Sequence, residues 1–200
     1  MGRRGARCPA SRRSRLLGER GGSAVEAVIV TPVVMMLIFG IVEMGFVFKD
    51  YLAVAGAVRA GVRIASASPR TSTFAQVAAN KVALTGGAMN FKDVQQMWVY
   101  KVSATSDKPI GYSDFSGCTT CVKFRWDAGT NAFVPTSDTW SAINQNACSS
   151  SSAFGPPDRI GVYIQLRHAP FTGFVFSNPL TISQASILTL EPMPVSEGCR

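Results

Sequence analysis

The 200-residue chain is 46% hydrophobic and only 16% charged, below the quarter or so of charged residues typical of soluble domains. Its net charge of +8 belongs mostly to the first 20 residues, which carry seven arginines and one acid. This distribution argues against nucleic acid as a partner, because a nucleic-acid-binding domain spreads its basic residues over a folded face. The length leaves room for one membrane segment and one modest domain.

The apolar segment near the start of the chain has the length of a transmembrane helix. No charge lies within Ala27–Val42, and Glu26 and Glu43 border this run. As an α-helix, the 25 residues of Ala24–Phe48 would cross a hydrocarbon core of about 30 Å. A protein of this size has no interior that could surround a helix apolar on every side. A secretory signal peptide also fits poorly, because its cleavage site would directly follow a shorter apolar run.

Glu26 is the informative residue of this segment, because an acid near the start of a membrane helix is costly and mostly functional. The basic leader, Gly21, Gly22 and then Glu26 before an apolar helix resemble the processing site of class III prepilins. A wider pattern over about residues 20–68 consists of Glu26, Pro32, Leu37–Glu43, Gly45, Ala57, Arg59, Gly61 and Arg63. This pattern is similar to the TadE-like family of pseudopilins from tight-adherence (Flp) pilus systems, although Ala27 stands where that family often has a larger residue. Ile187–Pro192 is similar to the closing strand of the family.

The resemblance implies a minor or accessory pilin-like subunit, since major pilins of these systems are much shorter. A prepilin peptidase would cleave between Gly21 and Gly22. Other pilin-like subunits, the pilus assembly machinery and membrane lipid would be the further partners. Because positive residues stay in the cytoplasm, the C-terminal part would lie outside the cytoplasmic membrane. The expected parts are a basic prepilin-type leader (1–21), a transmembrane helix (22–48), an amphipathic extension of that helix (49–68) and an extracytoplasmic domain (69–200).

Two residues of the membrane helix have expected roles. After cleavage the new amine of Gly22 is positive, and Glu26 of one subunit would pair with the amine of a neighbour and fix the stagger between packed helices. The alternative is that Glu26 only reaches toward the lipid headgroups. Pro32 should kink the helix, because it lacks an N–H and its ring crowds the preceding turn.

The rest of the chain predicts an α+β domain. One long helix over Ser23–Ser66 should end before Ser68-Pro69, and a shorter helix over Thr73–Leu84 should follow it. Alternating apolar residues predict a small antiparallel sheet, with the amphipathic part of the long helix across one face. The four expected strands are Met97–Val102, Cys121–Trp126, Ile160–Leu166 and Thr181–Leu190.

Three connecting segments complete the domain. The polar stretches 103–117 and 142–152 predict surface loops. The segment His168–Asn178 contains three phenylalanines and either packs on the core or forms an exposed apolar contact patch. We favour packing on the core.

Four cysteines outside the leader suit a domain that folds in an oxidising compartment. They allow three pairings, and we favour a bridge from Cys118 or Cys121 to Cys148 and a second bridge to Cys199. The spacing of Cys118 and Cys121 also occurs in redox and zinc sites. A strand rather than a helix follows them, however, and the single histidine, His168, is far along the chain.

No enzymatic activity, cofactor or metal is predicted. The chain lacks the nucleophile-elbow, phosphate-loop, dinucleotide-binding and zinc-protease motifs. The acids Asp107, Asp114, Asp127 and Asp138 occur singly in predicted loops, and a hydrolase with two carboxylates is a minor alternative. Two functions remain: the favoured pilin-like assembly protein, and a membrane-anchored extracytoplasmic binding module unrelated to pili.

Overall fold

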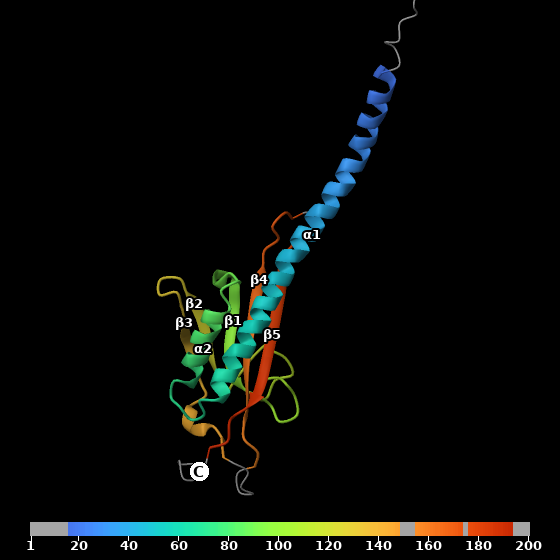
Figure 1. Cartoon of the computed structure of the whole chain (residues 1–200). Helices are drawn as coiled ribbons and strands as arrows, with labels where there is room; N and C mark the ends of the chain where they lie inside the picture. The colour runs from blue at the N-terminus through green and yellow to red at the C-terminus, as the bar shows by residue number, and fades with distance from the viewer. Residues whose placement is uncertain (1–15, 149–154, 174–175, 194–200) are drawn as a thin grey trace, which may run out of the picture.

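A long helix projects from a small sheet domain (Figure 1). The computed structural model describes residues 16–148, 155–173 and 176–193. The predicted α+β class is confirmed. In chain order the elements are α1 (Leu16–Ser66), α2 (Phe74–Thr85), the short 3-10 helix η1 (Phe91–Asp93), β1 (Val94–Lys101), β2 (Cys121–Asp127), β3 (Ala132–Asp138), the 3-10 helix η2 (Ala142–Asn144), β4 (Arg159–His168) and β5 (Leu180–Thr189).

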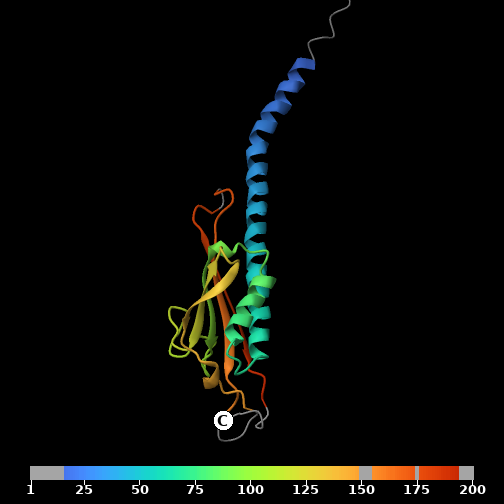
Figure 2. The ribbon, with the colours of Figure 1, turned by 90° about the vertical axis from the view of Figure 1, so that its left-hand side faces the viewer.

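Helix α1 is continuous over 51 residues. It ends at Ser66 as predicted, and the Ser66 hydroxyl donates a hydrogen bond to the Arg63 carbonyl in the last turn. It begins earlier than predicted, at Leu16, because the glycines of the leader lower helix propensity without interrupting the helix. Pro32 lies inside the helix. Figure 2 shows the helix changing direction in its N-terminal part, and the missing N–H of Pro32 accounts for such a bend.

The five strands form one antiparallel sheet in the order β3-β2-β1-β4-β5. In the register of the central strand β1, Val99 lies opposite Val122 of β2 and Val162 of β4. All three valines are buried in one core between sheet and helices. The neighbouring residue Trp98 belongs to a separate cluster on the other face, as the alternation of side chains along a strand requires.

Strand β3 is absent from the four strands that the sequence predicts. Its segment contains Pro135, which cannot donate to a strand ladder, so the sequence does not have the pattern of a central strand. The structure places β3 at the edge of the sheet, where proline is tolerated, with Pro135 opposite Phe124 beside a register shift. The strand is held by Phe133, which is buried and packs edge-on against Trp126.

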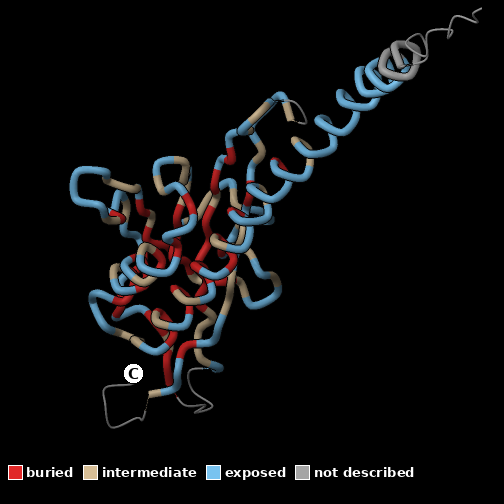
Figure 3. The backbone as a smooth tube through the Cα atoms, turned by 45° about the horizontal axis from the view of Figure 1, so that its top comes forward, coloured by how far each residue is buried: buried red, intermediate tan, exposed pale blue. Residues whose placement is uncertain are grey.

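Both helices cover the same face of the sheet, with α1 over β4 and β5 and α2 between α1 and β3. In Figure 3 the buried residues gather in this layer, whereas the projecting part of α1 is exposed along its length. The close approach of the two helices requires Gly61. A Cβ at this position would lie 2.6 Å from Cγ2 of Val82, a side chain that is fully buried on α2.

An aromatic cluster covers the other face of the sheet. The β1–β2 loop, predicted as a surface loop, folds back so that the Phe115 ring stacks on Tyr163 with 3.9 Å between the ring centroids. Tyr100 lies beneath the loop and donates a hydrogen bond to the Asp107 carbonyl, and burial raises the pKa of its phenol. The loop is therefore part of the folded domain.

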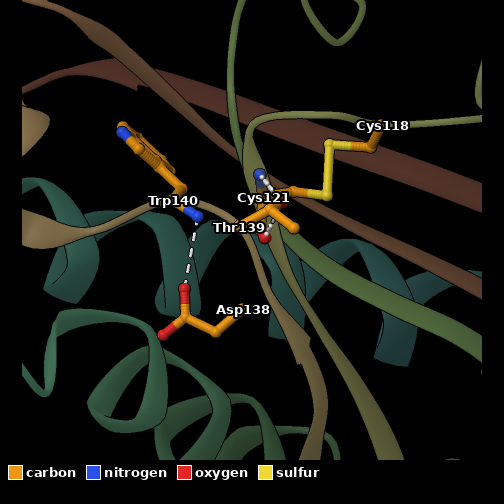
Figure 4. Close-up of a disulfide and its surroundings, with 5 residues drawn as sticks. All are labelled: Cys118, Cys121, Asp138, Thr139 and Trp140. Atoms are coloured by element: carbon orange, nitrogen blue, oxygen red, sulfur yellow. Dashed lines mark hydrogen bonds between the residues drawn. A yellow bond between two sulfur atoms is a disulfide. The ribbon is translucent and has the colours of Figure 1, made fainter.

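Cys118 and Cys121 form a disulfide where this loop enters β2 (Figure 4). The expected bridge from one of them to Cys148 is therefore wrong. Their Cα atoms are 6.1 Å apart, within the range for a disulfide, so the two cysteines nearest in sequence bond to each other. The second expected bridge, from the same pair to Cys199, is wrong for the same reason. Cys148 is itself disulfide-bonded, and Cys199 lies outside the described residues. The Thr139 hydroxyl donates to the Cys121 carbonyl at 2.9 Å and accepts from its N–H at 3.2 Å.

We predict that Gly61→Ala lowers the free energy of unfolding by about 1–2 kcal/mol, because the added methyl overpacks the contact with Val82 by more than the gain in helix propensity. The matched control is Gly56→Ala on the same helix, where nothing lies within 4 Å of the new Cβ. That variant should gain about 0.5–1 kcal/mol. Urea unfolding of the full chain in detergent, followed by tryptophan fluorescence, measures both. Equal stability of the two variants would contradict the close packing.

Candidate functional site

The projecting half of α1 is the largest unpartnered apolar surface of the described chain. From Gly22 to Ile38 every residue of the helix is exposed, although most of them are large and apolar. Val28 is 72% and Leu37 63% exposed. Such a surface is unfavourable in water and favourable in lipid. Among the described residues, α1 is the one helix long and apolar enough to cross a membrane.

The residues singled out in this half stand in the expected order along one helix. Gly21 and Gly22 lie within α1 rather than in a loop before it. Glu26 is exposed and follows Gly22 by four residues, so the two positions face the same side one helical turn apart. An amine created at Gly22 would therefore be within reach of this carboxylate or of one on a neighbouring helix. The leader residues 1–15 lie outside the described part of the chain.

Glu43, the acid at the other end of the apolar run, is completely buried. Its carboxylate accepts a hydrogen bond from the hydroxyl of Thr172, which lies in the loop between β4 and β5. Its second oxygen, Oε1, is also buried and has no hydrogen-bond partner among the described residues. The loop thus covers an acid that would otherwise face the same surroundings as the apolar side chains around it.

A second buried acid lies two turns farther along α1. Asp50 Oδ2 is 2.7 Å from Nδ1 of His168, the last residue of β4, and both side chains are largely buried. The other carboxylate oxygen of Asp50 lies 3.3 Å from Nζ of Lys49, which is half exposed. The loop and the helix also meet through their rings, with the Phe171 centroid 5.3 Å from that of Phe46.

These contacts fix the segment 168–173 against α1, and we call this segment the loop clasp. The sequence predicted that the phenylalanines of 168–178 pack on the core, but Phe171 is 72% exposed and its ring lies against Phe46 of α1. Phe176 is half-buried, and Phe174 lies outside the described residues. Two other residues of the clasp were not identified from the sequence. Thr172 and His168 contact acids that are 129 and 118 residues away in the chain, a separation for which a single sequence carries no signal.

The remaining residues of the family pattern on α1 lie beside the sheet domain, and they face two different sides of the helix. Ala57 and Gly61 face inward, where Ala57 is fully buried and Gly61 meets α2. Arg59 and Arg63 are exposed on the outer side and line a groove together with Lys81 of α2. Ala57 and Gly61 thus serve packing. Arg59, Arg63 and Lys81 form a group of positive side chains that we call the basic strip.

Of the acids weighed for catalysis, Asp107 pairs with Arg159 at 2.6 Å, whereas Asp114 and Asp127 are held within their own turns. Asp127 accepts hydrogen bonds from the Gly129 N–H and the Thr130 hydroxyl, which lower the pKa of its carboxyl. Hydrogen bonds from Ser116 likewise lower the pKa of Asp114. Among the described residues, no group of three histidines, cysteines or acids lies close enough together to hold a metal ion.

A comparison with known families supports the resemblance found in the sequence. The model of the TadE-like protein family matches residues 21–63. The match runs from the predicted cleavage site to the second arginine of the basic strip, and so includes the exposed half of α1 and most of the half that packs on the sheet. The family points to a function related to tight-adherence pili. No curated protein and no solved structure matches the chain.

We predict that His168→Ala lowers the free energy of unfolding by about 2–4 kcal/mol, because it leaves the buried Asp50 carboxylate without its nearest partner. Lys49→Ala removes the exposed partner of the same acid and should cost no more than about 0.5 kcal/mol. Urea unfolding of both full-length variants in detergent gives the comparison. Equal losses would show that the contact between His168 and Asp50 does not hold the loop clasp.

Proposed function

We propose that the protein is a minor pilin-like subunit of a tight-adherence pilus or a related secretion apparatus. The observation that carries this proposal is the position of the family match on α1. The family match at 21–63 coincides with a helix whose first half is exposed and apolar and whose second half belongs to the core of a sheet domain. In this proposal the protein has no enzymatic activity and acts by holding and presenting its outer domain.

The exposed half of α1 would cross the cytoplasmic membrane once. The arginine-rich leader would stay in the cytoplasm, and the sheet domain would lie on the opposite side. The positions of the acids agree with such a span. Between Glu26 and Glu43 the helix carries no charge, and Glu43 is shielded by the loop clasp.

Cleavage between Gly21 and Gly22 by a prepilin peptidase would change the electrostatics of the helix start. It removes the basic leader and creates an α-amino group one turn before Glu26, where the helix dipole adds positive partial charge. In a bundle of such helices, Glu26 would pair with the amine of a neighbouring subunit. A fixed distance between donor and acceptor along each helix would then set a fixed stagger between subunits.

The bend in α1 suits the same role. A proline inside a membrane helix leaves a backbone carbonyl without its usual donor, and neighbouring helices can satisfy it. Pro32 lies six residues after Glu26, within the part of the helix that a bundle would surround. The bent, exposed half would therefore have its partners in lipid and in other subunits.

We predict that the mature protein begins at Gly22 and lacks the 21 leader residues. Mass spectrometry of the protein purified from membranes of cells that possess a prepilin peptidase measures this directly. A large residue in place of Gly21, as in Gly21→Leu, should block the cleavage. An intact leader in unmodified protein from such cells would contradict pilin-type processing and support the membrane-anchored binding module.

We also predict that Glu26→Gln reduces recovery of the protein in the pilus complex about tenfold or more, because a charge-assisted pair contributes about 1.5–3 kcal/mol. Crosslinking to partner subunits and quantification of the assembled fraction give the measurement. Glu19→Gln is the matched control, since that acid lies in the leader. Unchanged recruitment of the Glu26 variant would contradict the pairing role.

A further inference from the structure

We propose that the loop clasp is a second membrane contact, with Phe171 inserted into the headgroup region of the outer leaflet of the bilayer that α1 spans. This inference rests on the membrane anchoring proposed above. It adds a lipid-binding surface on the sheet domain itself, at the end of β4. The partner is the phospholipid interface.

The position of the loop clasp is the first observation. The β4–β5 loop extends beyond the sheet along α1 in the direction of the exposed half of the helix (Figure 1). It is held there by three contacts on α1: Glu43 with Thr172, Phe46 with Phe171, and Asp50 with His168. The clasp therefore keeps a defined height along the helix axis.

Helix geometry gives the position of the loop clasp relative to the hydrocarbon core. Twenty residues of α-helix rise about 30 Å, the thickness of the hydrocarbon core, and Gly22–Ile41 supplies twenty. After the exposed run, Phe39 is the first half-buried residue of α1 and Glu43 is the first fully buried one, whereas Phe46 and Phe48 beyond it are exposed. A core that ended near Ile41 would place Glu43 at the outer boundary. A core reaching Phe48 would instead bury this acid and the polar backbone of the clasp in hydrocarbon, at several kcal/mol.

Phe171 then falls within the headgroup layer. Phe46, its ring partner, lies five residues past Ile41, which is about 7–8 Å along the axis, and helical side chains lean toward the N-terminus, here toward the lipid. The headgroup layer on one side of the core is about 5–8 Å thick. The two rings are thus at the depth where aromatic side chains are enriched in membrane proteins.

The chemistry of the clasp fits this environment. Phe171 is 72% exposed, and residues 169–173 carry no charged side chain. Gly173 has a φ of +68°, so the chain turns directly after the exposed ring of Phe171 and the hydrogen bond from Thr172 to Glu43. Lys49, whose Nζ lies 5.8 Å from the centroid of Phe46, is half exposed at the same level and can approach anionic headgroups. An exposed ring next to a proposed membrane span, with a cation beside it, favours lipid over a protein partner.

The test uses the full chain, reconstituted into vesicles of phosphatidylethanolamine and phosphatidylglycerol, with Phe171→Trp as a depth probe. Phe171 is exposed, so the substitution leaves the core unchanged. The control is Ile143→Trp in η2, which is equally exposed at 71% but lines a groove with Arg70 just past the far end of α1. The fluorescence of the unmodified protein is subtracted to remove the native tryptophans.

Vesicles whose lipid chains are brominated near the carbonyl end should quench the added Phe171→Trp emission about twofold or more, as expected for a ring at the headgroup boundary. The Ile143→Trp emission should be unaffected. Flotation of the same samples on a density gradient separates the two hypotheses. Protein that floats with the vesicles without quenching at position 171 would overturn the lipid contact and leave the anchor intact. Protein that does not float would overturn both.

A third outcome is also decisive. If the Phe171→Trp emission shifts to the blue without quenching, and the shift grows with the protein-to-lipid ratio, the clasp contacts a second copy of the chain. That result would overturn the lipid contact.

Discussion

The whole architecture depends on one helix that is continuous between two environments. The first half of α1 is exposed and apolar, and the second half supplies fully buried residues such as Val54 and Ala57 to the domain core. Because no loop separates the halves, the orientation of the sheet domain is coupled to that of the projecting helix. A force or a rotation applied to one half is transmitted to the other through a rigid element. This coupling is what a subunit that presents a domain from a membrane or a filament requires.

The transition between the two environments occurs over two helical turns, and it is marked by acids. Glu43 and Asp50 would each be costly at an apolar boundary, and one loop covers both. The β4–β5 loop therefore has a structural reason to follow α1 beyond the sheet. The same two contacts, from Thr172 to Glu43 and between His168 and Asp50, also join the loop to α1 at the point where the sheet ends.

The sequence is most informative where local patterns decide the structure. The end of α1 at Ser66, the extent of α2 and four of the five strands follow from periodicity and breakers, because these elements pack with one apolar face each. Strand β3 is not predictable from its own sequence, because Pro135 is compatible with a strand only at the edge of a sheet. Which strand lies at the edge depends on how the whole sheet is arranged.

The features that the sequence does not reveal depend on contacts between distant residues. The clasp joins Glu43 to Thr172, and no local pattern connects positions 129 residues apart. The pairing of Cys118 with Cys121 depends on how the β1–β2 loop folds over the aromatic face, which fixes the two cysteines at the start of β2. In the candidate site, the order of Gly21, Gly22, Glu26 and Pro32 was predictable because all four belong to one helix.

The proline at the edge of the sheet has a consequence for a protein that would work in many copies side by side. An open strand edge is a template for adding the strand of another molecule, and such additions grow into aggregates. Pro135 removes a donor from the outer strand, and the register shift beside it distorts the ladder. This edge therefore resists fusion with a second sheet, so crowded copies would not polymerise by adding strands to β3.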